Sequence, residues 1–204
     1  MTFPLDFSAC GPIFDAAPEG VSMELKPGKI LICEGEIARR VEELAAAVNG
    51  IYGGAPVMLV GVLDGCLIFL SDLIRRLEMP IEIALVRVKT YGASTRPQKK
   101  PAIAEEDLSR IPGRNVLIVD DISDSGATLA ALLEAFRAAG ARSVRACVLL
   151  EKDRSRERPV KADLVGFKIP DVFVVGYGLD YAGKYRNLPY VAALEGFDGG
   201  PVIA

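Results

Sequence analysis

The residues best suited to chemistry form a short polar cluster, in which Asp120 and Asp121 precede the run D-S-G-A-T at residues 124–128. Two adjacent carboxylates repel each other and lose hydration unless a bound group offsets this cost, and sugar hydroxyls or a divalent cation are suitable groups. The backbone N–H groups and hydroxyls of residues 125–128 suit a phosphate, which Gly126 allows to approach closely. The pattern therefore predicts a phosphate and a hydroxylated ring bound side by side.

A simpler interpretation is that Asp124 or Ser125 only caps a helix, which is a common role for both residue types. Capping does not explain the adjacent pair Asp120 and Asp121. Two common nucleotide-binding motifs, G-x-x-x-x-G-K-(S/T) and G-x-G-x-x-G after a strand, do not occur in the chain. We therefore expect the cluster itself to hold any phosphate.

A strand and a helix must position this cluster. Residues 116–119 are an unbroken aliphatic run, typical of a strand covered on both faces. In a parallel sheet, ligands bind beyond the carboxyl ends of the strands, where the N-termini of helices offer free N–H groups. Gly140 is the expected C-cap of the following helix. The apolar stripe of that helix consists of Leu129, Leu132, Leu133 and Phe136.

The rest of the chain predicts an α/β fold, with a central, mostly parallel sheet flanked by helices. A long polar loop is expected at residues 91–113, and short strands at 163–167 and 172–181 predict a small hood. We expect a single domain over residues 1–204, with a core at about 29–160 and a hood at about 1–28 and 161–204. Helices are predicted at 34–48 and 66–77, and strands at 56–62, 81–90 and 143–151.

Composition excludes several classes of function. The net charge of −3 provides no positive field to hold nucleic acid or an anionic membrane. No stretch reaches the ~18 apolar residues of a membrane span, and the N-terminus has no basic region typical of a signal peptide, so we expect a cytoplasmic protein. The scattered cysteines indicate reduced thiols. The chain has no histidine, so a base near neutral pH is expected to be a carboxylate.

The cluster resembles the signature of the phosphoribosyltransferase family, which is an apolar strand, two acidic residues and D-(S/T)-G-x-T at the start of a helix. The matching stretch is VLIVDDISDSGATL. From about Lys29 to Leu194 the chain further resembles the hypoxanthine-guanine branch, in VGVLDGCLIFLSDLIRRL, KTYGAST, LLEKDRS and VGFKIPDVFVVGYGLDYAGKYRNLPY. The resemblance implies the type I phosphoribosyltransferase fold. It also implies Mg²⁺-dependent transfer of phosphoribosyl from 5-phosphoribosyl-1-pyrophosphate to hypoxanthine or guanine, in purine salvage.

The resemblance implies how the sugar donor is bound. Asp120 and Asp121 would hold the ribose hydroxyls and, with Asp180, the Mg²⁺ ion. Asp124 would be the general base at N7 of the purine. The residues that would surround the 5′-phosphate are Asp124, Ser125, Gly126, Ala127 and Thr128.

The resemblance also implies how the purine is bound. Lys152 would donate to the 6-oxo group, Phe173 would stack on the base, and the backbone of Val174 would contact its edge. An acceptor at position 6 distinguishes hypoxanthine and guanine from adenine, whose amino group is a donor. Thr90 and Tyr91 would begin a mobile loop that closes over the site.

The implied pyrophosphate site contains one departure from the family pattern. Leu63, Asp64 and Gly65 would form a loop that binds pyrophosphate together with Arg186. The family commonly carries a basic residue where this chain has Asp64. An acid there would repel pyrophosphate unless it turns away or reaches a metal through water, so we expect backbone N–H groups to make that contact.

Alternatives remain for both the residues and the function. Phe173 could be a core residue, Lys152 a solvated cation, and Asp180 with Arg186 a surface pair. The chain could instead be a regulator that senses the donor or a nucleotide without salvage activity, or a relative that prefers xanthine. The expected partners are the small-molecule substrates and further copies of the chain, as a homodimer or homotetramer, with no nucleic acid and no membrane.

Overall fold

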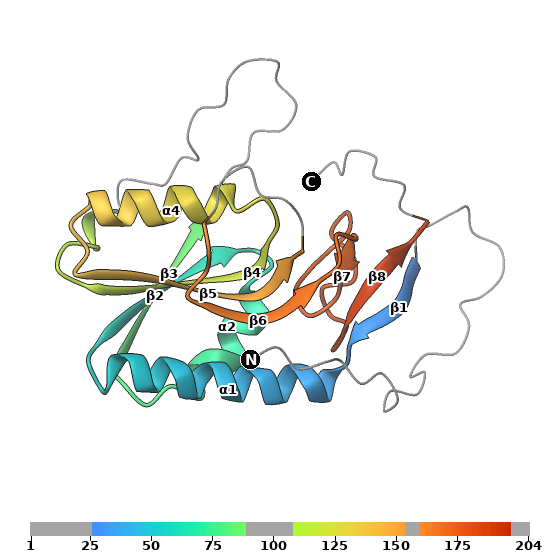
Figure 1. Ribbon diagram of the computed structural model, residues 1–204, viewed down its shortest axis with the longest axis horizontal. Coiled ribbons are helices and arrows are strands. Elements are labelled where there is room, and N and C mark those ends of the chain that lie inside the picture. Colours follow the sequence, from blue (N-terminus) through green and yellow to red (C-terminus); the bar gives the residue numbers. More distant parts are fainter. Residues whose placement is uncertain (1–25, 89–107, 154–159, 197–204) are drawn as a thin grey trace, which may run out of the picture.

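The computed structural model describes residues 26–88, 108–153 and 160–196. Its larger sheet has the strand order β3-β2-β4-β5-β6, and each neighbouring pair is parallel. This arrangement confirms the predicted α/β class (Figure 1). The five strands are β2 (Val57–Leu63), β3 (Ile81–Arg87), β4 (Asn115–Ser123), β5 (Ser143–Lys152) and β6 (Leu164–Ile169).

Helices cover both faces of this sheet. Helices α1 (Glu34–Tyr52) and α2 (Leu67–Ile74) lie on one face, and α4 (Ala127–Ala138) lies on the other (Figure 1). The predicted helix at 34–48 is thus a turn longer, whereas the one at 66–77 ends earlier. The helices in the described part of the chain lack the length and apolarity that a membrane span requires.

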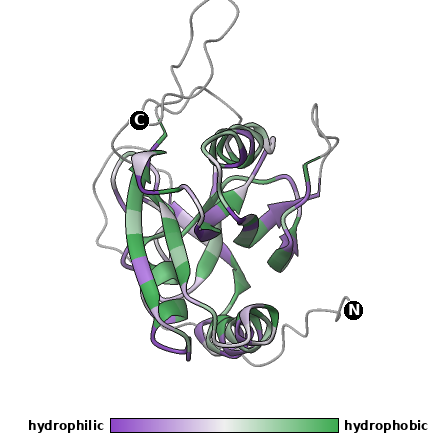
Figure 2. Cartoon of the chain, turned by 90° about the vertical axis from the view of Figure 1, so that its left-hand side faces the viewer, coloured by the Kyte–Doolittle hydropathy of each residue, from purple (hydrophilic) through white to green (hydrophobic). Residues whose placement is uncertain are grey.

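Strand β4 lies between two apolar cores. Leu117 and Val119 belong to the core under α1 and α2, whereas Val116 and Ile118 belong to the core under α4. The strands are largely hydrophobic in Figure 2. The stripe predicted for the following helix is buried throughout, as Leu129, Leu132, Leu133 and Phe136 of α4. Because β4 is anchored on both faces, the polar residues at its end are held in a fixed position.

Buried thiols contribute to this packing. Cys66 and Cys147 are buried and free, and Cys33 is also free. Burial raises the pKa of both Cys66 and Cys147 to about 12, so these thiols remain protonated at neutral pH. This finding fits the predicted reduced state of the cysteines. Cys10 lies outside the described residues.

A smaller sheet stands beyond the strand ends of the larger one, with the order β1-β8-β7 (Figure 1). Strand β1 (Lys26–Ile32) pairs antiparallel with β8 (Val191–Glu195), which in turn pairs with β7 (Val174–Val175). The sequence did not predict β1 or β8 as strands. The stretch predicted as a strand at 172–181 is a strand only at β7, because Gly176 and Gly178 adopt positive φ angles there and turn the chain.

The predicted boundary of the hood is wrong at one strand. Residues 164–169, expected in the hood, form β6 and pair in parallel with β5, for example Leu150 with Phe167. A parallel strand usually follows a helical crossover, and no described residue between β5 and β6 is helical. Conversely, residues 29–32, expected in the core, pair with β8. The division into a core and a hood otherwise stays a prediction.

Candidate functional site

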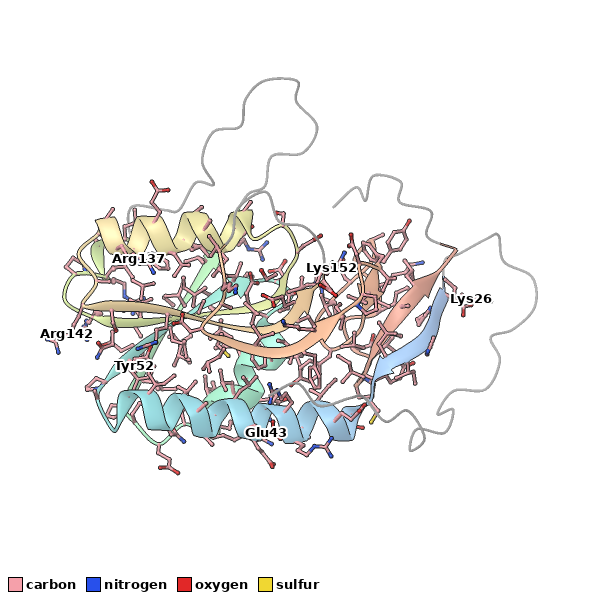
Figure 3. All side chains as sticks on the ribbon, viewed as in Figure 1. Lys26, Glu43, Tyr52, Arg137, Arg142 and Lys152 are labelled. Atoms are coloured by element: carbon pink, nitrogen blue, oxygen red, sulfur yellow. The ribbon has the colours of Figure 1, made fainter. Side chains whose placement is uncertain are left out.

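The predicted site residues gather where the parallel strands end. Ser123, the last residue of β4, is paired with Glu151 of β5. Asp124, which follows β4, therefore lies beside Lys152, the last residue of β5. Figure 3 shows Lys152 at the end of β5, on the side where the smaller sheet stands. The site therefore lies at the carboxyl edge of the sheet, as expected for a parallel α/β fold.

The positions of Asp120 and Asp121 disfavour the ionised form of both carboxyl groups. Asp120 is 6% exposed, and the backbone N–H of Asp121 donates to its Oδ1 at 3.1 Å. Burial, and then the neighbouring Asp121 charge, raise the pKa of Asp120 well above its usual value. Burial also raises the pKa of Asp121, against the hydrogen bonds to its carboxylate and the charge of Arg186. A cation or hydroxyl donors bound at this point would stabilise the ionised form of both groups.

Helix α4 begins directly after the cluster. Gly126 has φ of +77° at the N-cap, a conformation that strains any other residue. Ser125 Oγ accepts a hydrogen bond of 3.3 Å from the N–H of Ala127, so a capping contact exists. The first-turn N–H groups of a helix have no partner within the helix, and those of α4 start at the cluster. The segment 125–128 thus has the form of an anion site.

Lys152 lies between two carboxylates. Its Nζ is 3.5 Å from Oδ2 of Asp124 and 3.3 Å from Oδ1 of Asp171, and its side chain is 11% exposed. The interpretation of Lys152 as a solvated cation is therefore wrong. Asp171 was not singled out in the sequence, because nothing in its local pattern indicates that it meets the end of β5.

The loop after β2 packs tightly against the carboxylate pair. A Cβ atom added to Gly65 would lie 1.7 Å from Oδ2 of Asp121, and one added to Gly178 would lie 2.1 Å from the carbonyl oxygen of Gly65. Both glycines are therefore required by close approach. The peptide bond between Leu63 and Asp64 is cis. Residues from the loop after β2, from β4 and from the segment after β7 thus form one stack.

Asp64 is paired with a cation that the sequence did not reveal. Its Oδ1 is 2.8 Å from Nη2 of Arg87, the last residue of β3, which stands opposite Leu63 in the sheet. The side chains of Arg87 and Asp64 are 69% and 43% exposed. Hence the negative charge of Asp64 is balanced from the neighbouring strand rather than left facing an anion.

Asp180 and Arg186 contact each other. Nη2 of Arg186 is 2.8 Å from Oδ1 of Asp180, and its Nη1 donates to the carbonyl oxygen of Gly178 at 2.6 Å. The other oxygen of Asp180 accepts from the N–H of Gly183 at 2.7 Å. The alternative interpretation of Asp180 and Arg186 as an ion pair is therefore correct, while their roles toward Mg²⁺ and pyrophosphate stay predictions. The positive charge of Arg186 opposes the rise in the pKa of Asp121.

The described residues contain no group of three or more side chains that could hold a metal ion by themselves. Asp120, Asp121 and Asp180 therefore do not form a complete cage. Mg²⁺ often binds through one or two carboxylates together with waters and substrate phosphates. The oxygen donors fit a Mg²⁺ ion that arrives with a phosphorylated substrate.

The aromatic part of the site precedes β7. Phe173 is half-buried, and its ring meets that of Tyr181 edge to face, with centroids 5.8 Å apart. Val174 is 5% exposed. Phe173 is therefore less enclosed than a core residue, and Tyr181 is an addition that sequence reasoning missed. Thr90 and Tyr91 lie outside the described residues.

The chain is similar to known proteins along most of its length. The family model described as "Phosphoribosyl transferase domain" matches residues 33–182. The chain is 44% identical to the hypoxanthine-guanine phosphoribosyltransferase of Bacillus subtilis (strain 168), over 82% of this chain and 93% of that protein. It is 40% identical to the hypoxanthine phosphoribosyltransferase of Salmonella typhimurium, over 80% of this chain and 93% of that protein.

Solved structures give the same picture. A hypoxanthine-guanine phosphoribosyltransferase from Bacillus anthracis has a TM-score of 0.75 at 34% identity, with 84% of this chain and 99% of that chain covered. A mutant hypoxanthine phosphoribosyltransferase from Trypanosoma cruzi, in a ternary substrates complex, has a TM-score of 0.77 at 33% identity. That match covers 83% of this chain and 96% of the other.

Proposed function

Because the chain belongs to the phosphoribosyl transferase family and to its hypoxanthine-guanine branch, we propose that it is a purine-salvage enzyme. It transfers the phosphoribosyl group from 5-phosphoribosyl-1-pyrophosphate to N9 of hypoxanthine or guanine, and it releases pyrophosphate. The observation that carries this proposal is the meeting of the Asp120–Asp121 pair, the N-terminus of α4 and Lys152 at one edge of the sheet.

The donor binds across β4 and α4. The ribose hydroxyls donate to Asp120 and Asp121, which favours the ionised form of two carboxyl groups whose pKa values are raised by burial. The 5′-phosphate accepts from the N–H groups of residues 125–128 and from the hydroxyls of Ser125 and Thr128. The positive φ of Gly126 lets the backbone wrap the phosphate.

Departure of pyrophosphate builds positive charge on the ribose ring and negative charge on the leaving group. Leu63, Asp64 and Gly65 supply backbone contacts to the pyrophosphate, and Arg186 supplies a positive charge near Asp121. A bound Mg²⁺ ion, held by the substrate with Asp120, Asp121 and Asp180, would neutralise the leaving oxygens. Arg87 keeps the Asp64 charge balanced, which answers the expected repulsion.

The purine lies between the aromatic residues and the end of β5. Asp124 accepts the N7 proton as N9 attacks the sugar, which is general base catalysis by a carboxylate. Lys152 donates to the 6-oxo group, and Phe173 stacks on the ring beside Tyr181. A donor at this position favours hypoxanthine and guanine, because adenine carries an amino group there.

The test is pyrophosphate release from the donor and Mg²⁺ with hypoxanthine, guanine, xanthine and adenine in parallel. The native protein is expected to act on hypoxanthine or guanine, and Asp124→Asn is expected to lower kcat by about 100-fold or more. Glu43→Gln is the matched control, since Glu43 is an exposed carboxylate of α1 paired with Arg40. Release of pyrophosphate with none of the four purines would refute the proposal, and binding of the donor alone would indicate a sensor.

We also propose that the enzyme is a cytoplasmic homodimer or homotetramer. Leu67 of α2 and Ile83 and Leu85 of β3 are large apolar residues with exposed fractions of 51%, 41% and 44%. The side chains of Leu70 in α2 and Leu85 in β3 both lie close to Gly61, so α2 and β3 are neighbours there. Strand β3 is also an edge of its sheet. The subject of one Trypanosoma cruzi structure is the oligomeric state of that enzyme. Sedimentation of the purified chain would measure its mass.

A further inference from the structure

We propose that Asp171 is a positioning residue for purine recognition, which holds the Lys152 ammonium between the general base and the 6-oxo group. This inference rests on the proposed function. It starts from the position of Nζ, 3.5 Å from Oδ2 of Asp124 and 3.3 Å from Oδ1 of Asp171. Both distances exceed the usual length of a charged hydrogen bond, which is about 2.7–2.9 Å, so the ammonium forms ion pairs with both carboxylates and is not closely bound to either.

A single partner would place Lys152 badly for the reaction. If the ammonium bonded only to Asp124, it would stabilise the ionised form of that carboxylate and make it a weaker base toward N7. It would also direct its N–H groups toward the phosphate loop rather than toward the purine. A second carboxylate on another segment of the chain counters the attraction of the ammonium to Asp124. Asp171, in the turn after β6, is that carboxylate.

The backbone fixes Asp171 opposite the lysine. Lys152 is paired with Ile169 at the end of the β5–β6 ladder, and the N–H of Asp153 donates to the carbonyl oxygen of Ile169 at 2.8 Å. The N–H of Val172 donates to the carbonyl oxygen of Pro170 at 2.9 Å, which closes a tight turn around Asp171. The carboxylate is thus held by the strand pairing that orients Lys152.

The ammonium has three donors in a tetrahedral arrangement. With one donor directed at Asp171 and one toward Asp124, the third is left for an acceptor on the purine. The lysine side chain is only 11% exposed, so water competes weakly for it. Asp171 therefore acts through Lys152 and sets the direction of the N–H that distinguishes a 6-oxo from a 6-amino purine.

The test measures binding by calorimetry with two probes, GMP and ribose 5-phosphate, because only GMP carries the 6-oxo base. Asp171→Asn keeps the shape of the side chain and removes its charge. We expect it to weaken GMP binding by about tenfold, the scale of one charged hydrogen bond, with ribose 5-phosphate binding unchanged. Asp171→Glu is expected to recover most of the loss. In steady-state kinetics Asp171→Asn should raise the KM of the purine but not that of the donor.

The control is again Glu43→Gln, since Figure 3 shows Glu43 on α1, away from Lys152. Unchanged GMP binding in Asp171→Asn would overturn the role of Asp171 while leaving the proposed function intact. Equal weakening of both probes would indicate a structural role and would also overturn it. A native protein that binds neither probe would refute the proposed function together with this inference.

Discussion

Replacement of Gly65 by alanine probes the contact between residues 63–65, which we propose bind pyrophosphate, and Asp121, which we propose binds the ribose. The new Cβ would lie 1.7 Å from Oδ2 of Asp121, whereas real Cβ contacts are essentially never shorter than 3.0 Å. The carboxylate or the loop must therefore move by more than an ångström. Overpacking of this kind costs about 1–3 kcal/mol, and the restricted unfolded chain returns about 0.4–1 kcal/mol.

The expected loss of stability is therefore at most about 2.6 kcal/mol, or a fall in Tm of roughly 5–10 °C at 2–4 °C per kcal/mol. The KM of the sugar donor should change more strongly than the stability. A displaced Asp121 would lose the charged hydrogen bond that we propose it accepts from the ribose, worth about 1.5–3 kcal/mol, so the KM of the donor should rise by about 10- to 100-fold. The KM of the purine should change little, because Lys152 and Phe173 are untouched.

Steady-state kinetics with each substrate varied in turn, together with thermal unfolding, measures both quantities. Gly50→Ala is the matched control, because a Cβ at this exposed position of α1 meets nothing within 4 Å. It should be neutral or stabilise the protein by up to about 1 kcal/mol. A Gly65→Ala variant with native donor KM and native Tm would refute the packing of this loop on Asp121.

Three further predictions concern single charges and one hydroxyl. The pKa of Asp120 in the folded protein lies above the usual 3.8, so the folded protein loses stability as pH rises through that raised pKa. Asp120→Asn removes this loss and should raise Tm at pH 7–8. In thermal unfolding the gain should vanish near pH 4. Arg87→Gln should change stability by less than about 1 kcal/mol but raise the donor KM, and Asp64→Asn in the same chain should restore it. Buried Ser123 Oγ has no hydrogen-bond partner within the described residues, so urea unfolding of Ser123→Ala should give a free energy of unfolding about 1 kcal/mol higher; a lower value would reveal a partner.

Local sequence patterns were sufficient for the core of the fold. The aliphatic run at 116–119 and the stripe of α4 each depend on residues close in sequence, and both are buried as predicted. Asp120, Asp121 and residues 125–128 lie close together in the sequence at the end of β4, so their proximity in space was also predictable.

The rest depends on how distant strands are aligned. Arg87 meets Asp64 only because β3 and β2 are paired with Leu63 opposite Arg87. Asp171 meets Lys152 only because β6 joins the large sheet, and β6 was the strand assigned to the hood. Hydrophobic periodicity reports which face of a strand is buried and so excludes a slip of one residue. It does not show which strands are neighbours, and it does not distinguish registers that differ by two residues.

The stack of Gly178 on Gly65 and of Gly65 on Asp121 links the site to the completion of folding. These residues come from the end of the chain, its first third and its middle, so contacts of long sequence separation must form before the stack exists. Consider a partly folded molecule that retains β4 and α4 but in which the segment after β7 has not docked. It has residues 125–128 in place, but Gly65 is not yet covered by Gly178. Ligands that span the stack therefore bind only the completed molecule and stabilise it by mass action. The native fraction of a preparation is then measurable as its titratable ligand-binding capacity.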